Sequence, residues 1–436
     1  MLEAIHAALW GAPTLALFLC VGFWFSAKTR FFQITRFPYW MKHTFGTLLK
    51  SKENYQSATQ NPEQQKGISS FQALTGALAA CMGTGNIAGV ATAIVLGGPG
   101  AVFWMWLSSI FGMMIAFAEN TLGVKYRYKE VDGQYMGGGM VILARGVGMK
   151  KLGGFWCALL IASSFGVGNM TQGNSAAAAL HESFGLSPAA VGIALAALVG
   201  VVAAGGIKRL ARVSELLIPM LSAVFLLGCI ALIVGNAATL SGVLGAVVSG
   251  AKSRAAMRWG IARGVFSNEA GLGTSPLIHS SANCRHPAEQ GLWGIAEVFV
   301  DTTVMCVVTG LAILCSGVYS PSGTRTGAAL CGDAFAQMFG APGRAFISIS
   351  LCLYAFATLL GWGQYGRQGA KYLLGKRGER PFLVLFVAGV FVGCIVKLET
   401  VWLAADVLNA LMAFPNLLGL VLLRREAIGA LKTLKD

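Results

Sequence analysis

Long apolar segments alternate with short polar connections along almost the whole of this 436-residue chain. About 20 consecutive apolar residues in a helix are enough to cross the hydrocarbon core of a bilayer. Windows of that length predict eleven spans, at residues 10–27, 68–96, 98–120, 154–180, 187–206, 214–235, 258–282, 289–316, 343–372, 381–398 and 400–423. The pattern therefore predicts an all-α polytopic membrane protein with 11 transmembrane helices.

Lysine and arginine gather in the connections between these spans. The clusters lie at residues 28–66, 125–151, 208–212 and 367–380 and in the tail from Arg424. Basic connections stay in the cytoplasm, which places the N-terminus outside and the C-terminal tail inside, as an odd number of spans requires. We expect a multi-pass protein of the plasma (inner) membrane, with the lipid bilayer around it.

Four stretches outside the spans have a composition that predicts their secondary structure. Residues 29–50 mix bulky aromatic and basic side chains, which predicts an interfacial helix on the cytoplasmic side. Pro38 marks either the start of this helix or a kink, because proline fits the first turn of a helix and not its interior. Residues 51–66 are polar and predict a loop, while 240–256 and 326–338 predict surface helices on the outer face.

One motif occurs twice, as Asn86-Ile-Ala-Gly-Val-Ala-Thr92 and as Asn268-Glu-Ala-Gly-Leu-Gly-Thr274. The copies fall in spans two and seven, which cross the bilayer in opposite directions. This predicts an inverted 5+5 repeat preceded by one extra N-terminal helix; the alternative is a chance likeness in a chain rich in glycine and alanine. The units are residues 1–67 with the interfacial helix, 68–240 with the first five helices, and 241–436 with the second five and the cytoplasmic tail.

Both copies follow residues that interrupt an apolar helix. An interrupted helix frees N–H groups that suit a carboxylate and carbonyl groups that suit an ammonium group or a bare cation, and a zwitterionic amino acid matches both. Unwound backbone at membrane depth is tolerated where it lines a cavity or is buried in protein. The candidate substrate-binding residues are Gly83, Thr84, Gly85 and Asn86 in the first break and Phe266, Ser267 and Asn268 in the second. The structural alternative is close packing of helices for the glycines and, for Thr84 and Asn86, hydrogen bonds that satisfy the freed backbone groups.

Polar side chains elsewhere in the spans add candidates for the same site. Gln172, in the polar run Gly168-Asn-Met-Thr-Gln-Gly-Asn174, is the preferred further substrate contact; the alternative is a hydrogen bond to a neighbouring helix. Trp362 is a candidate wall of the pocket, with a packing or interfacial role as the alternative. Cation-binding candidates are Thr84, Asn268, Glu269 and Thr358, with a sodium ion expected near Cys81, Thr84 and Thr358.

The buried acids allow more than one interpretation, because a charge at membrane depth must be paired or hydrogen-bonded. Glu269 either neutralises a cation or an ammonium group, holds the two half-helices together through backbone N–H groups, or pairs with Arg263. Asp301 and Asp406 are further candidates, each either an ion ligand or a tie between helices.

Composition excludes several other classes of protein. The chain is 55% hydrophobic and 12% charged, whereas soluble domains have roughly 45–50% and about 25%. The net charge of +15 lies in short clusters and not along one patch, so no nucleic-acid partner is expected. The ten cysteines form no C-x-x-C pair and the five histidines are dispersed. Without a P-loop or a catalytic constellation, we expect that the protein is not an enzyme and has no cofactor, and that transport is driven by an ion gradient or by the gradient of the substrate itself.

Three segments resemble the alanine/glycine:cation symporter family. They are Gly83-Thr-Gly-Asn-Ile-Ala-Gly-Val, Gly206-Ile-Lys-Arg-Leu-Ala, and Arg263-Gly-Val-Phe-Ser-Asn-Glu-Ala-Gly-Leu-Gly-Thr274, within a resemblance that runs from about residue 20 to residue 425. The resemblance implies a LeuT-like core and uptake of alanine or glycine with sodium or a proton. It also implies a tight pocket, with Thr84, Gly85, Gln172, Phe266, Asn268 and Trp362 among its residues.

One departure from the pattern concerns the cation. LeuT-like sodium sites often use two neighbouring hydroxyl groups on the ninth span, whereas here Ala357 precedes a lone Thr358. Sodium and proton coupling therefore both stay open. The rival function is transport of another small neutral solute by the same architecture.

Overall fold

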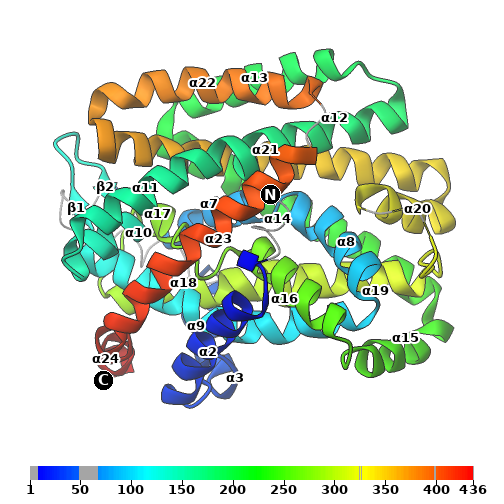
Figure 1. The fold of residues 1–436 in the computed structure, drawn as a ribbon, viewed down its shortest axis with the longest axis horizontal. Helices are drawn as coiled ribbons and strands as arrows, with labels where there is room; N and C mark the ends of the chain where they lie inside the picture. Colours follow the sequence, from blue (N-terminus) through cyan, green and yellow to red (C-terminus); the bar gives the residue numbers. More distant parts are fainter. Residues whose placement is uncertain (1–7, 49–66, 324, 326, 397–398, 436) are drawn as a thin grey trace.

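We used a computed structural model of the protein, which describes residues 8–48, 67–323, 325, 327–396 and 399–435. Within these residues the regular structure is helical apart from a short antiparallel hairpin of β1 (Tyr128–Lys129) and β2 (Tyr135–Met136). The predicted loop at 51–66 lies outside the described residues. In Figure 1 the hairpin and the C-terminal helix α24 lie at one end of the molecule, and α15 and α20 lie at the other.

The first half of the chain contains the long helices α9 and α14 and several shorter ones. Their bounds are α2 Ala12–Lys28, α3 Phe32–Thr35, α4 Phe37–His43, α5 Phe45–Leu48, α7 Ser70–Cys81, η2 Thr84–Asn86, α8 Ala88–Gly97, α9 Gly100–Tyr126, α10 Gly139–Val141, η3 Ile142–Gly146, α11 Lys150–Phe165, η4 Gly166–Met170, α12 Thr171–Phe184, α13 Pro188–Ala204 and α14 Gly206–Gly235. Here η2 is a 3₁₀ turn, and η3 and η4 are single π-helical turns.

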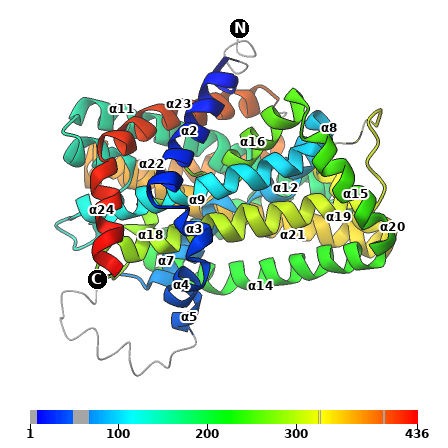
Figure 2. The ribbon, with the colours of Figure 1, turned by 90° about the horizontal axis from the view of Figure 1, so that it is seen from below.

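The second half begins with α15 on the surface and ends with α24. Its bounds are α15 Ala237–Gly250, α16 Arg254–Asn268, α17 Pro276–His279, α18 Pro287–Val298, η5 Phe299–Cys306, α19 Val307–Cys315, α20 Gly327–Phe339, α21 Ala341–Leu374, α22 Lys376–Ile395, α23 Glu399–Leu422 and α24 Arg424–Lys435. The segment η5 is π-helical. In Figure 2, α9, α19 and α14 run roughly parallel, and α19 contacts both of the others.

Seven continuous helical segments of the described chain are long and apolar enough to cross a membrane. They start at Gly100, Lys150, Gly206, Pro287, Ala341, Lys376 and Leu403. Five further apolar helices are shorter, among them α7 and α8, which are the two parts of the predicted second span. Large apolar side chains on α14 and α22, such as Leu216, Leu227 and Val384, are exposed, as expected where a helix faces lipid.

Both motif copies interrupt their helices. A capping box between Ser69 and Gln72 starts α7, which ends at Cys81 before the turn η2 and a new helix, α8. The second interruption follows α16, where Glu269 adopts a left-handed conformation with φ 55°. A non-glycine residue rarely adopts this conformation, and Gly271 and Gly273, with φ 88° and 83°, continue the unwound segment up to α17.

The elements predicted outside the spans are also helical. Pro38 lies in the first turn of α4, so it marks a helix start and not a kink. The predicted surface helices at 240–256 and 326–338 correspond to α15 and α20. The stretch 29–50 is not one helix, because α3, α4 and α5 are separate short helices.

Candidate transport site

The first break meets α12 and α21 at Gly83. A Cβ atom on this glycine would lie 2.5 Å from Thr358 Oγ1 and 3.0 Å from Gln172 Oε1. Gln172 Oε1 also accepts a hydrogen bond from the backbone N–H of Thr84 at 3.3 Å. The predicted residues Gly83, Thr84, Gln172 and Thr358 are therefore brought together, and a residue larger than glycine at position 83 would displace its neighbours.

Two hydroxyl groups at this point are buried and have no hydrogen-bond partner among the residues that the structure describes. They are Thr84 Oγ1 and Thr358 Oγ1, in residues that are 1% and 2% exposed. Buried polar atoms are usually paired, so these oxygens are available to a ligand. Cys81, the third residue expected near sodium, directs its Sγ to the carbonyl oxygen of Leu78 in its own helix, at 3.7 Å.

The two breaks also contact each other and η5. The nearest protein atom to a Cβ on Gly85 would be Cα of Ser267, at 3.5 Å. Asp301 joins both breaks, since it accepts hydrogen bonds from Asn86 Nδ2 at 2.8 Å and from Ser267 Oγ at 2.8 Å. Asn268 Nδ2 donates to Thr302 Oγ1 at 3.1 Å. Asn86, Ser267 and Asn268 thus make contacts within the protein that hold the breaks in place.

Glu269 is hydrogen-bonded and does not pair with Arg263. Its two carboxylate oxygens accept hydrogen bonds from Trp362 Nε1 at 2.9 Å and from Thr274 Oγ1 at 2.7 Å. Arg263 instead forms an ion pair with Asp406 at 3.3 Å. The pairing of Glu269 with Arg263, which the sequence left open, is therefore wrong, and Glu269 links the second break to α21.

A cavity of about 730 Å³ extends from the two breaks toward the end of the molecule that carries α20. Thr84, Gly85 and Phe266 line its inner part. The other lining residues come from α8, α12, α16, α20 and α23, and include Thr92, Asn174, Glu182, Trp259, Gly327 and Asp406. The guanidinium group of Arg263 lies over the rings of Phe266 and Trp259, 5.2 and 5.7 Å from their centroids.

Several predicted site residues are buried outside the cavity lining. Asn86, Ser267, Asn268 and Trp362 are all 0–1% exposed. Trp362 packs against η4, where a Cβ on Gly168 would come within 2.3 Å of its side chain. The substrate-binding candidates thus form two groups: Thr84, Gly85 and Phe266 at the cavity, and the others behind it.

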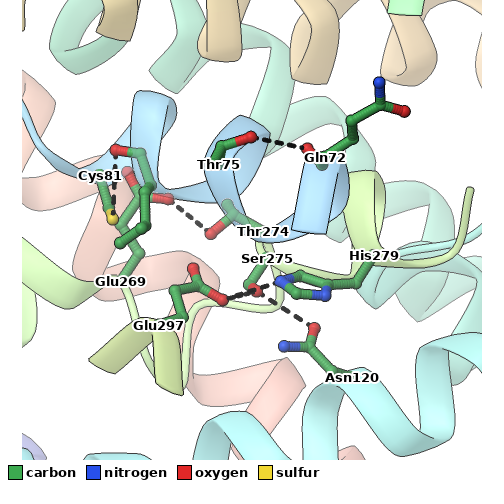
Figure 3. A network of polar contacts seen from close by, with 10 residues as sticks. Gln72, Thr75, Cys81, Asn120, Glu269, Thr274, Ser275, His279 and Glu297 are labelled. Carbon is green, nitrogen blue, oxygen red and sulfur yellow. Dashed lines mark hydrogen bonds and ion pairs between the residues drawn. The ribbon is translucent and has the colours of Figure 1, made fainter. Parts of the chain in front are cut away.

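Sequence reasoning missed a second group of buried polar residues, drawn in Figure 3. The Glu297 carboxylate is hydrogen-bonded to Ser275 Oγ and to His279 Nε2. Ser275 Oγ is also within hydrogen-bond distance of Asn120 Oδ1. Glu119, next to Asn120, accepts hydrogen bonds from the backbone of Gly273 and from Asn416. The signal that drew attention to Asp301 and Asp406, an acid in an apolar helix, would have found Glu119 and Glu297 too.

The comparisons with known proteins agree with this architecture. The model of the sodium:alanine symporter family matches residues 1–436. The sodium/alanine symporter AgcS of Methanococcus maripaludis is 37% identical over 100% of this chain and 97% of its own. The probable sodium/glutamine symporter GlnT of Bacillus subtilis is 34% identical over 97% of this chain and 88% of its own.

A solved structure supports the fold. The crystal structure of MhsT in complex with L-phenylalanine aligns with a TM-score of 0.62, covering 80% of this chain and 88% of that one. The identity is 16%, so this likeness concerns the fold alone, which is LeuT-like. The family that the chain matches is one of transporters and not of enzymes. The chain belongs to the sodium:alanine symporter family and is a multi-pass membrane transporter that carries amino acids in symport with a cation.

Proposed function

We propose that the protein takes up a small neutral amino acid, alanine or glycine, together with a sodium ion, by alternating access. The observation that carries this proposal is the meeting of both helix breaks at the inner part of one cavity, beside two unpartnered hydroxyl groups. A cation and a zwitterion placed there would each contact unwound backbone. Symport follows if each binds the carrier better when the other is present.

The amino acid occupies the space beside Thr84, Gly85 and Phe266. Its carboxylate lies against the N–H groups at the start of α8, where a helix N-terminus favours negative charge. Phe266 limits the length of the side chain. Gln172 holds Thr84, and the remaining candidates, Gly83, Asn86, Ser267, Asn268 and Trp362, support the breaks from behind.

The sodium ion lies between the first break and α21. Thr358 Oγ1 and Thr84 Oγ1 are hard oxygen donors, and the break supplies carbonyl groups at the end of α7. Cys81 is the last residue of α7, so it would contribute its backbone carbonyl group and not its side chain. Asn268 and Glu269 lie in the second break, on the opposite side of the ion. Thr358 provides one hydroxyl group at this point of α21, where LeuT-like sodium sites often have two. Proton coupling is therefore the alternative, and the experiment must distinguish it from sodium coupling.

The proposed topology has eleven spans, an extra first helix and two inverted units of five. Its N-terminus is outside, which puts the basic segments around β1, β2 and α24 in the cytoplasm. The cavity then opens to the outside and the described structure represents an outward-facing form. Alternating access also requires an inward-facing form. In that form the start of α7 and the end of α17, which lie away from the cavity, move apart from each other.

The test is uptake of labelled alanine into proteoliposomes under an inward sodium gradient, a proton gradient, or neither. We expect accumulation with sodium alone, competition by unlabelled glycine, and weak competition by glutamine. Accumulation with the proton gradient and not with sodium would contradict the sodium site. If no gradient drives alanine while another neutral solute accumulates, the substrate assignment is wrong and the rival function holds.

A further inference from the structure

An exposed face of α14 begins with basic side chains and continues with apolar ones. Lys208 and Arg212 lie in the first two turns of the helix, and both are exposed. Leu216, Leu227 and Val234 follow and are 73%, 65% and 67% exposed. The steps from Arg212 to Leu216, Leu227 and Val234 are close to whole numbers of helical turns, so these side chains share one face.

The basic end of this face lacks a neutralising acid. Neither Lys208 nor Arg212 forms an ion pair within the described part of the chain. Arg209, which is also exposed, donates a hydrogen bond to the uncharged carbonyl oxygen of Val201 at 2.6 Å. Glu215, the acid nearest in sequence, instead accepts a hydrogen bond from Gln72 Nε2 of α7 at 2.9 Å. The first two turns of α14 therefore present three positive charges to the surroundings of the protein.

The distance between the basic and apolar parts matches the edge of a lipid leaflet. The step from Arg212 to Leu216 covers about 6 Å along the helix axis. The polar headgroup layer of one leaflet is roughly 5 to 8 Å thick. In Figure 2, α14 runs along the molecule toward α15, so its apolar part extends away from the basic end. A phosphate group beside the cations would thus have its acyl chains beside Leu216 and the residues beyond it.

We propose that the start of α14 binds one anionic phospholipid of the surrounding bilayer. Its phosphate group lies between Lys208 and Arg212, and an acyl chain lies along the apolar face that begins at Leu216. Side chains four residues apart on a helix have Cβ atoms about 5–6 Å apart, so both can reach one phosphate. A guanidinium group can bind two phosphate oxygens at once, and the N-terminus of the helix also favours negative charge.

Retention of basic connections in the cytoplasm accounts for some of these cations without any bound lipid. That role depends on the number of cations and not on the face of the helix to which they belong. It does not require Lys208 and Arg212 to share a face with exposed apolar side chains. It also does not require the neighbouring acid, Glu215, to be directed toward α7. The joint arrangement of charge and apolar surface is what favours a lipid.

The site lies next to a part of the protein that moves in the proposed transport cycle. Gln72, the partner of Glu215, belongs to the capping box that starts α7. In the proposed inward-facing form, the start of α7 moves. A lipid bound to α14 would therefore lie beside the helix from which α7 separates. The lipid site itself does not depend on which amino acid is transported.

The test is native mass spectrometry of the full-length protein in detergent, titrated with dioleoylphosphatidylglycerol or with dioleoylphosphatidylcholine. The two lipids have the same acyl chains and differ in the net charge of the headgroup. Each lysine or arginine near an anionic lipid contributes about a factor of five in affinity. We therefore expect the first phosphatidylglycerol to bind about thirtyfold more tightly than the first phosphatidylcholine.

The preference should depend on the two cations of α14. In the double variant Lys208→Gln/Arg212→Gln, both lipids should bind with nearly the same affinity. The matched control is Lys252→Gln/Arg254→Gln, which removes two exposed charges between α15 and the first turn of α16 and should keep the preference of the wild type. The single variants Lys208→Gln and Arg212→Gln should each lose about a factor of five. They decide the question if the double variant does not fold.

Equal affinity of the wild type for the two lipids would overturn the proposal, and so would a full preference in the Lys208 and Arg212 variants. Glycerol 1-phosphate carries the phosphate without acyl chains and should not displace the bound phosphatidylglycerol. If it displaces the lipid at an equal concentration, the site holds a soluble phosphate compound and the lipid assignment is wrong. The measurement uses neither alanine nor a gradient. Failure of alanine uptake would count against the proposed function and not against this site.

Discussion

At the scale of single residues, Thr358 carries the coupling hypothesis, because its hydroxyl group is buried and unpartnered beside Gly83. We expect Thr358→Ala to raise the sodium concentration for half-maximal alanine uptake by about tenfold, or about 1.4 kcal/mol. Thr358→Ser keeps the oxygen and should stay close to the wild type. The measurement is initial uptake against sodium concentration. Equal sodium dependence in all three proteins would show that Thr358 is not a ligand.

The two glycines of the first break should tolerate an added methyl group very differently. At Gly83 a Cβ would lie 2.5 Å from Thr358 Oγ1, whereas at Gly85 the nearest atom would be 3.5 Å away. Gly83→Ala should therefore abolish sodium-dependent uptake. Gly85 lines the cavity, so Gly85→Ala should fold normally, keep glycine uptake and weaken competition by alanine several-fold. Identical substrate profiles for Gly85→Ala and the wild type would place the substrate elsewhere.

At the scale of elements, the ion pair of Arg263 and Asp406 connects α16 to α23 beside the cavity. Asp406→Asn weakens this connection while the backbone carbonyl of residue 406 still accepts a hydrogen bond from Trp10 Nε1. We expect the cavity to stay open for longer. A cysteine introduced at Ser175, which lines the cavity, should then react several-fold faster with a membrane-impermeant thiol reagent. Unchanged labelling would mean that this ion pair does not restrict access.

The same scale shows what the sequence could and could not predict. Apolar periodicity located the helices, and the glycines and polar residues of the repeated motif located both breaks, because these signals are local. The partner of Glu269 was not predictable, since Trp362 lies 93 positions away and only the fold brings the two together. The contact of His279 with Glu297 was not predicted, because a search for metal-binding spacing does not detect a pair formed by two different helices, α17 and α18.

At the scale of the whole molecule, the remaining question is which end faces the cytoplasm. The end with β1, β2 and α24 carries Lys125, Arg145 and Arg424, and basic segments are retained inside. Val131 is fully exposed in the hairpin at that end, and Ser322 is exposed between α19 and α20 at the other. These two positions therefore form a matched pair for measuring orientation.

We expect a cysteine at Ser322 to react with an impermeant thiol reagent in intact cells, and one at Val131 to react only after permeabilisation. Labelling is read on the peptide that contains each site, so the native cysteines do not interfere. The reverse pattern would place the cavity on the cytoplasmic side. The cavity would then be an exit path for substrate taken up from outside. Orientation thus decides the physiological direction of the proposed transport, although the contacts around the cavity do not depend on it.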